Sequence, residues 1–146
     1  MLKSLACSWL LAIASIPGIA QGTHPAEIST REGRAVQAVV AAQLKALAAG
    51  DSAAAFSYAA PSIKQQFGDA EAFMEMVRRS YPMLISPASV SFFRPEAGDG
   101  GVTQDVHFRD HEGKLWRARY VLRKEPDKRW RIGGCVVAAD NDASTT

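Results

Sequence analysis

Hydrophobic and polar positions alternate along the last third of the chain. Between residues 116 and 122 and again between 130 and 136, the even-numbered positions are apolar or glycine, while arginines occupy the odd-numbered positions 117, 119 and 131. Alternation with a period of two is typical of an antiparallel sheet with one face on a core and the other in water. We therefore expect even-numbered side chains from Val102 to Val136 to face the core.

A hairpin fixes the register of the two central strands. Residues 111–113 suit a three-residue loop with Gly113 in the left-handed conformation. A slip of one residue would mix apolar and polar side chains on both faces, so the pattern specifies one pairing. The predicted inner pairs are Phe108 with Trp116, Val106 with Ala118 and Gln104 with Tyr120, and the outer pairs are Asp105 with Arg119 and His107 with Arg117.

A second hairpin is predicted to turn through residues 125–127. Glycines at positions 133 and 134 predict a bulge that bends the last strand. In this register Cys135 points outward near Arg117, where an isolated small thiol is expected to be inert. The predicted pairs are Leu122 with Trp130, Tyr120 with Ile132 and Trp116 with Val136.

Helical periodicity fills the segment ahead of the sheet. Apolar residues recur at helical spacing from about residue 31 to residue 49, and Asp51 and Asp69 are suited to cap helices over 52–59 and from 70 onward. A helical fragment is expected over 61–68, and Pro82 ends the last helix. A first strand is expected over 90–94. The predicted fold is α+β, with N-terminal helices packed on a curved four-stranded antiparallel sheet.

The first twenty residues predict a cleavable signal peptide. Lys3 precedes an apolar run over residues 5–16, and Pro17 is followed by small residues at Gly18 and Ala20. The run is shorter than the roughly 20 apolar residues that a membrane span needs. We expect cleavage near Ala20 and export to the periplasm or the medium. The predicted organisation is a signal over 1–20, a flexible leader over 21–30, a single domain over 31–139 and a disordered tail over 140–146.

Charge and cysteine content narrow the function classes. Without Lys3 the chain keeps 17 − 1 = 16 basic residues against 15 acidic ones, so no strong net charge attracts nucleic acid or acidic membrane. Loss of Cys7 with the signal leaves Cys135 alone, which predicts no intramolecular disulfide. The spacing of the three histidines predicts no metal site, and no cofactor is expected.

Three clusters resemble a bacterial family known as domain of unknown function 4864, within the nuclear-transport-factor-2-like (cystatin-like) superfamily. They lie at residues 55–68, at 73–82 and at Trp130-Arg131-Ile132-Gly133-Gly134-Cys135. The resemblance implies a cystatin-like cone over nearly the whole mature chain. It implies no activity, because the family has none to carry over, and the wider superfamily includes enzymes, binding modules and dimerising adaptors.

The inner face supplies the candidate pocket. A glutamine and several phenols can orient a ligand, but they form a poor proton relay at neutral pH. The alternative is a filled core in which Gln104 and Tyr120 hydrogen-bond each other. The candidate pocket residues are Gln104, Phe108, Trp116, Tyr120 and Trp130 from the strands, with Tyr58 and Tyr81 from the helices.

The outer face supplies a candidate partner surface. It has no aromatic residues to stack bases, so nucleic acid is not expected. Leu115, Val121 and Val137 share this face and make it a mixed surface suited to protein contact, including a homodimer. The alternative is a solvated face, on which Asp105 and His107 form ordinary charge pairs. The candidate residues are Arg117, Arg119, Arg123, Arg129 and Arg131.

Three functions are consistent with these patterns. The first is an exported, non-enzymatic module that binds a small apolar ligand or a protein partner. The second is an isomerase- or lyase-like enzyme that orients its substrate with Tyr120, Gln104 and a helix residue. The third is a structural homodimer. A cavity that reaches Gln104 would support the first two, and an ionisable side chain near Tyr120 would favour the enzyme.

Overall fold

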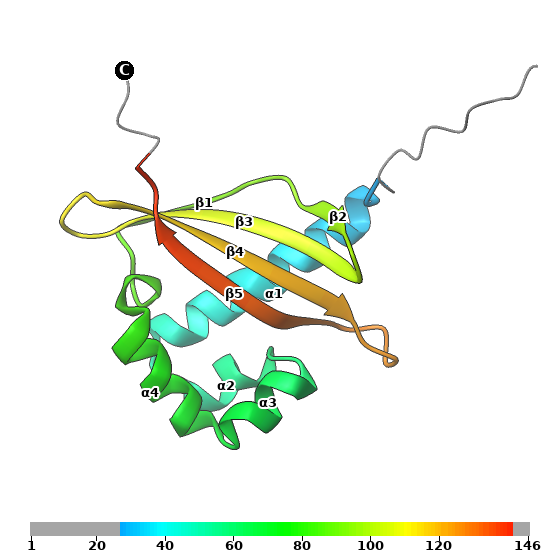
Figure 1. The fold of residues 1–146 in the computed structure, drawn as a ribbon, viewed down its shortest axis with the longest axis horizontal. Coiled ribbons are helices and arrows are strands. Elements are labelled where there is room, and N and C mark those ends of the chain that lie inside the picture. Colours follow the sequence, from blue (N-terminus) through cyan, green and yellow to red (C-terminus); the bar gives the residue numbers. More distant parts are fainter. Residues whose placement is uncertain (1–26, 142–146) are drawn as a thin grey trace, which may run out of the picture.

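A computed structural model describes residues 27–141, in which four helices precede an antiparallel sheet (Figure 1). The α+β class predicted from the sequence is therefore confirmed. The helices are α1 (Thr30–Ala48), α2 (Ser52–Ser57), α3 (Pro61–Phe67) and α4 (Ala70–Ser80), followed by the short 3-10 helix η1 (Pro82–Leu84). The strands are β1 (Ser89–Phe92), β2 (Glu96–Gly98), β3 (Gly101–Arg109), β4 (Leu115–Lys124) and β5 (Trp130–Ala139). The predicted signal peptide lies outside the described residues, as does most of the predicted tail.

Side-chain caps begin three of the helices. Ser29, Asp51 and Asp69 each accept a hydrogen bond from the backbone N–H three residues later, at 3.2, 3.0 and 2.8 Å. These bonds satisfy N–H groups that lack partners within the helix. At the other end, α4 stops at Ser80 and the chain turns at Pro82 into η1. The two predicted aspartate caps are thus confirmed.

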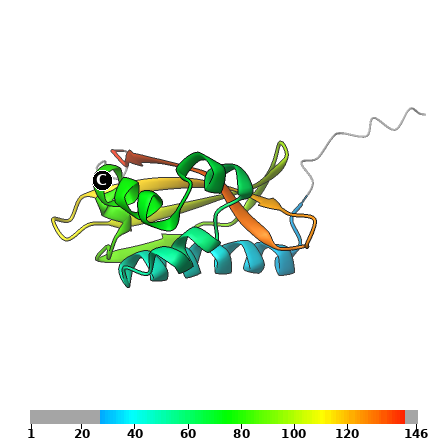
Figure 2. The same cartoon turned by 90° about the horizontal axis from the view of Figure 1, so that it is seen from below.

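The sheet has five strands where the sequence predicted four. Its order is β1-β3-β4-β5, and β2 also pairs with β3. β1 and β2 share one edge of β3 but are separated at Pro95, which has no N–H to donate to a neighbouring strand. Figures 1 and 2 show α1 running beneath one face of the sheet, while α2, α3 and α4 gather beside the β5 edge.

The register of β3 with β4 is confirmed. Phe108 is paired with Trp116, Gln104 with Tyr120, and Asp105 with Arg119. Along β3 the even-numbered side chains are buried and the odd-numbered ones are not, as expected for a sheet with one wet face.

The predicted register of β4 with β5 is wrong in two steps. First, the hairpin loop is residues 126–128, because Lys128 adopts a left-handed conformation (φ 68°) and donates its N–H to the Glu125 carbonyl at 2.9 Å. Leu122 therefore pairs with Ile132 and Lys124 with Trp130. Second, the predicted bulge is present, but it shifts the register so that Tyr120 pairs with Cys135.

After the bulge, each side chain of β5 points to the opposite face of the sheet from the one predicted. Trp116 pairs with Ala139 instead of Val136, and Val136 is 70% exposed instead of buried. Cys135 and Val137 instead pack against the core. Even-numbered positions therefore face the core through Ile132 but not beyond it.

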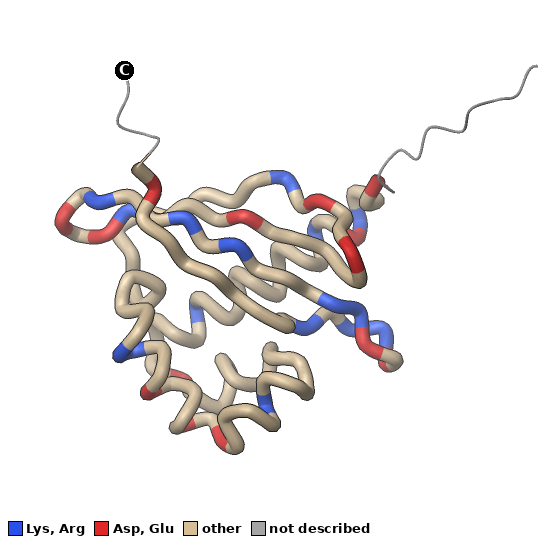
Figure 3. The backbone as a smooth tube through the Cα atoms, viewed as in Figure 1, with Lys and Arg blue, Asp and Glu red and all other residues tan. Residues whose placement is uncertain are grey.

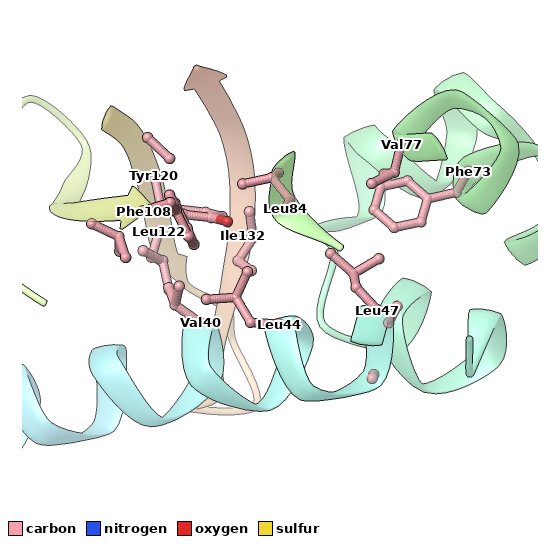
Figure 4. Packing of buried hydrophobic residues seen from close by; sticks show 14 of the residues in the cluster. Val40, Leu44, Leu47, Phe73, Val77, Leu84, Phe108, Tyr120, Leu122 and Ile132 are labelled. Carbon is pink, nitrogen blue, oxygen red and sulfur yellow. The ribbon is translucent and has the colours of Figure 1, made fainter. Parts of the chain in front are cut away.

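The core joins α1 to the sheet and continues to α4. Figure 4 shows Val40, Leu44 and Leu47 on α1 beneath buried side chains of β3, β4 and β5, with Phe73 and Val77 farther along. Within residues 27–141, no helix combines the length and apolar character needed to cross a membrane.

Candidate functional site

A cavity of about 450 Å³ lies between the β4–β5 side of the sheet and the helices α3, α4 and η1. Its deep wall is apolar and comes from elements far apart in the chain, because α1, α4, η1 and β5 each contribute. The buried apolar side chains of this wall are Leu47, Phe73, Val77, Leu84 and Ile132. Gln66 and Ser80, which are exposed, line its opening.

Backbone hydrogen bonds hold the α2–α3 connection against β5. Ile132 donates its N–H to the Tyr58 carbonyl at 2.9 Å and accepts from the Ala60 N–H at 2.8 Å. These bonds satisfy the outer edge of β5 at this point, where an unpaired strand edge would otherwise face solvent. They also fix the start of α3, so this side of the cavity is anchored to the sheet.

Tyr120 provides the polar group at the buried end. The residue is 1% exposed, and its hydroxyl has no hydrogen-bond partner among the described protein groups. In Figure 4 the oxygen points from β4 toward Leu84 and Ile132. Burial raises the pKa of Tyr120 well above its usual value, and the neighbouring Cys135 thiol adds to this shift. The phenol is therefore a neutral hydrogen-bond donor at physiological pH.

Cys135 lies beside Tyr120, not on the outer face where the sequence placed it. The bulge at residues 133–134 turns its side chain inward and into the cavity lining. Burial raises the pKa of the Cys135 thiol to about 12, against a smaller lowering by Tyr120. The thiol influences the phenol's pKa, but the two groups do not meet hydrogen-bond geometry. Since the thiolate is the reactive form, Cys135 is a poor nucleophile at neutral pH.

The cavity lining contains no Asp, Glu, Lys, Arg or His. Cys135 is the ionisable group near Tyr120 that would have favoured an enzyme, but burial keeps it protonated. General acid–base catalysis needs a group whose pKa lies near the operating pH. The lining therefore suits binding better than proton transfer.

Only two of the predicted pocket residues, Tyr81 and Tyr120, line the cavity. Gln104 is fully buried elsewhere, and its amide donates to the carbonyls of Phe93 and Asp105, at 2.7 and 2.8 Å. Its Oε1 and the Tyr120 hydroxyl both lack a partner among the described residues, so the predicted bond between Gln104 and Tyr120 is not formed. The cavity does not reach Gln104.

The remaining predicted pocket residues have structural positions. Phe108 is buried in the core, and Trp116 donates its indole N–H to Asp110 at 2.9 Å. Trp130 lies under the Lys124 ammonium at 5.7 Å, and Tyr58 packs against the core. The helical periodicity predicted the apolar face of α4. It could not indicate that this face lines a cavity, because the cavity depends on how α4 packs beside β5.

The outer face carries arginines along β4 beside an acidic residue of β3 (Figure 3). Asp105 accepts from Arg117 at 2.7 Å and from Arg119 through two bonds of 2.8 Å. Hydrogen bonds from Arg119, and to a smaller extent Arg117, lower the pKa of Asp105 to about 2. Arg123 and Arg131 pair across β4 and β5, and Arg129 lies exposed in the turn before β5.

Two predictions about the outer face need correction. Val136 replaces Val137 on it, because of the bulge. His107 is a Cα partner of Arg117, but its Nδ1 instead approaches the Asp140 carboxylate at 3.3 Å, and its ring lies 4.3 Å from that of Phe93. His107 is half-buried, not open to solvent. Homodimerisation through this face stays a prediction.

Residues 27–141 contain no group of three or more His, Cys, Asp or Glu side chains arranged to hold a metal ion.

A family model described as "Domain of unknown function (DUF4864)" matches residues 29–145. A solved structure from Catenulispora acidiphila is similar, with a TM-score of 0.48 and 19% identity, covering 75% of this chain and 92% of that chain. Comparison with curated proteins finds no match.

Proposed function

We propose that this chain, which belongs to the family described as "Domain of unknown function (DUF4864)", binds a small and largely apolar molecule in the cavity beside β5 without transforming it. The observation that carries the proposal is the Tyr120 hydroxyl, which lies unpartnered at the buried end of an apolar cavity. Buried polar groups in folded proteins nearly always have a partner, so an exception calls for an explanation. Among the described residues Gln104 Oε1 and His107 Nε2 are also buried without a partner, but of these three groups only the Tyr120 hydroxyl belongs to a residue that lines the cavity.

The size and lining of the cavity support this function. A volume of about 450 Å³ falls within the roughly 300–1,000 Å³ typical of small-molecule sites. Such sites are mostly hydrophobic with a few placed polar groups, which matches a lining that includes Phe73, Val77 and Leu84 together with Tyr120. The isomerase- or lyase-like alternative has less support, because the lining offers no group that titrates near neutral pH.

A cavity-filling variant tests the proposal. We expect 2-isopropylnaphthalene to bind the purified chain and to raise its melting temperature, because a ligand of the native state stabilises it. Val77→Phe, which adds bulk at the cavity wall, is expected to abolish this shift, whereas Val136→Phe on the opposite sheet face should leave it unchanged. Equal melting shifts in both variants would contradict binding in this cavity.

The finer fold and the destination of the chain are part of the same proposal. One helix beneath a face of the sheet, three more beside its β5 edge and a bulge at residues 133–134 support a cone of the nuclear-transport-factor-2-like (cystatin-like) superfamily. The basic and apolar pattern of residues 1–20 supports export with cleavage near Ala20. The mass of the protein recovered from the periplasm tests the latter, since retention of residues 1–20 would contradict it.

A further inference from the structure

On the basis of the proposed ligand binding, we infer that the ligand buries an uncharged hydrogen-bond acceptor against the Tyr120 hydroxyl. The carbonyl of a ketone or aldehyde is such an acceptor. The cavity rejects molecules that would bury an ionised group.

The first step is that Tyr120 lacks an acceptor and its protein neighbours do not supply one. The Gln104 side chain, whose residue is the Cα partner of Tyr120 on β3, donates its amide to the carbonyls of Phe93 and Asp105, and its Oε1 makes no hydrogen bond with the Tyr120 hydroxyl. Gln43, another lining residue, donates its side-chain amide to the Ala55 carbonyl at 3.2 Å. A ligand oxygen at the buried end would satisfy the phenol, and a neutral hydrogen bond is worth up to a factor of about ten in affinity.

The second step is the absence of compensating charge. No lining side chain is a cation, so a carboxylate brought to Tyr120 would be desolvated without a counter-ion. An ammonium group would meet the same cost, because the lining contains no carboxylate. Burial raises the pKa of both Tyr120 and Cys135, as expected where desolvation disfavours the charged form of a group of either sign.

The third step concerns orientation and size. The polar lining residues Gln66 and Ser80 are exposed at the opening. The buried part of the lining is hydrocarbon apart from Tyr120, Cys135 and Gln43, whose amide already donates to the Ala55 carbonyl. The ligand therefore places its carbonyl inward, its apolar body along Phe73 and Val77, and any further polar group at the opening. At roughly 30 Å³ per non-hydrogen atom, the share that a water molecule takes in the liquid, the cavity holds up to about 15 such atoms.

The test uses three naphthalene derivatives with equal numbers of non-hydrogen atoms: 2-acetonaphthone, 2-isopropylnaphthalene and 2-naphthoate. Their dissociation constants would be measured by calorimetry at neutral pH for the unaltered chain, Tyr120→Phe and the matched variant Tyr58→Phe. We expect Tyr120→Phe to weaken binding of the ketone about tenfold and to leave the hydrocarbon unchanged. Tyr58→Phe, at a half-buried position outside the cavity lining, should alter neither constant. The carboxylate should bind at least tenfold more weakly than the ketone.

The outcomes separate the two proposals. Failure of all three compounds to bind the unaltered chain would contradict the proposed function itself. Binding of the hydrocarbon and ketone with equal losses in Tyr120→Phe, or tighter binding of the carboxylate than of the ketone, would overturn the inference and leave cavity binding intact. Unchanged hydrocarbon affinity in Tyr120→Phe also reports that this variant keeps its fold.

Discussion

Individual residues on the two faces of the sheet have opposite electrostatic surroundings. On the wet face Asp105 is ionised and receives three hydrogen bonds from two arginines. On the packed face Tyr120 and Cys135 are kept neutral by burial. Both effects follow from the relative solvation of charged and neutral forms, which is what a pKa shift reports.

Asp105→Asn should reduce stability in a pH-dependent way. The folded pKa of Asp105, about 2, lies below its usual value of 3.8, so the carboxylate stabilises the fold above about pH 4 and loses that effect as the pH falls toward 2. We expect a loss of about 1 kcal/mol at neutral pH, since the arginines are partly exposed, and a difference from the unaltered chain that shrinks steadily as the pH falls from about 4 through 2. Urea unfolding across this range measures it.

The control is Asp99→Asn, in the exposed turn between β2 and β3, which should follow the unaltered chain at every pH. A constant difference between Asp105→Asn and the unaltered chain down to pH 2 would show that Asp105 acts through packing instead of charge.

Cys135 should resist alkylation. With its pKa near 12 the thiolate is scarce at neutral pH, so the reaction with iodoacetamide should be at least about 100-fold slower than for a free thiol. The chain would carry Cys7→Ser so that one thiol remains. Val136→Cys with Cys135→Ser, which moves the thiol by one residue to a 70% exposed position, should react like a free thiol. Cys135 is half-buried, so similar rates at the two positions would contradict the raised pKa of its thiol.

At the scale of elements, β5 illustrates what a single extra residue does to a strand. Before the bulge, Ile132 faces the core, as the predicted inward orientation of even-numbered side chains requires. After it, Cys135 and Val137 occupy the inner face and Val136 the outer one. The side-chain period of a strand is two, so one unpaired residue reverses every later position.

A pair of threonine substitutions tests this reversal. Val136→Thr should change the free energy of unfolding by less than about 0.5 kcal/mol, as is usual for exposed positions. Val137→Thr places a hydroxyl against the core and should cost about 1 kcal/mol or more. Chemical denaturation of both variants measures the difference. The reverse ranking would restore the register predicted from alternation alone.

At the scale of the whole molecule, the cavity exists because the helices take two different positions. α1 packs beneath the sheet, while α3 and α4 lie beside β5 and are joined to it at Ile132 by backbone hydrogen bonds (Figures 1 and 2). The space between these two groups of elements is the cavity. Ligand binding should therefore tighten the α3–α4 side of the molecule.

Hydrogen exchange with 2-acetonaphthone tests this expectation. Added protection is predicted in α3, in α4 and in β5 around Ile132, since these segments line the cavity. β1 and β2, at the opposite edge of the sheet, serve as an internal control and should exchange at unchanged rates. Protection spread evenly over both edges would contradict a local site.

Much of the fold was predictable because it depends on local patterns. Alternation gave the inner and outer faces of β3 and β4, and Gly113 fixed their pairing. Asp51 and Asp69 marked helix starts through the geometry of their own side chains. The arginines around Asp105 followed from the same register.

The sequence by itself thus determined the α+β class, the register of the first hairpin and the wet face of the sheet, since each depends on neighbours along the chain or across one loop. Only the tertiary structure decided that β5 changes phase, that Cys135 meets Tyr120, and that Gln104 takes no part in the cavity. These outcomes depend on a left-handed Lys128, an unpaired Gly133 and the docking of α3 and α4 beside β5. Each of these features results from a balance of packing and backbone hydrogen bonds between residues distant in the sequence, and the hydrophobic periodicity of the sequence does not indicate that balance.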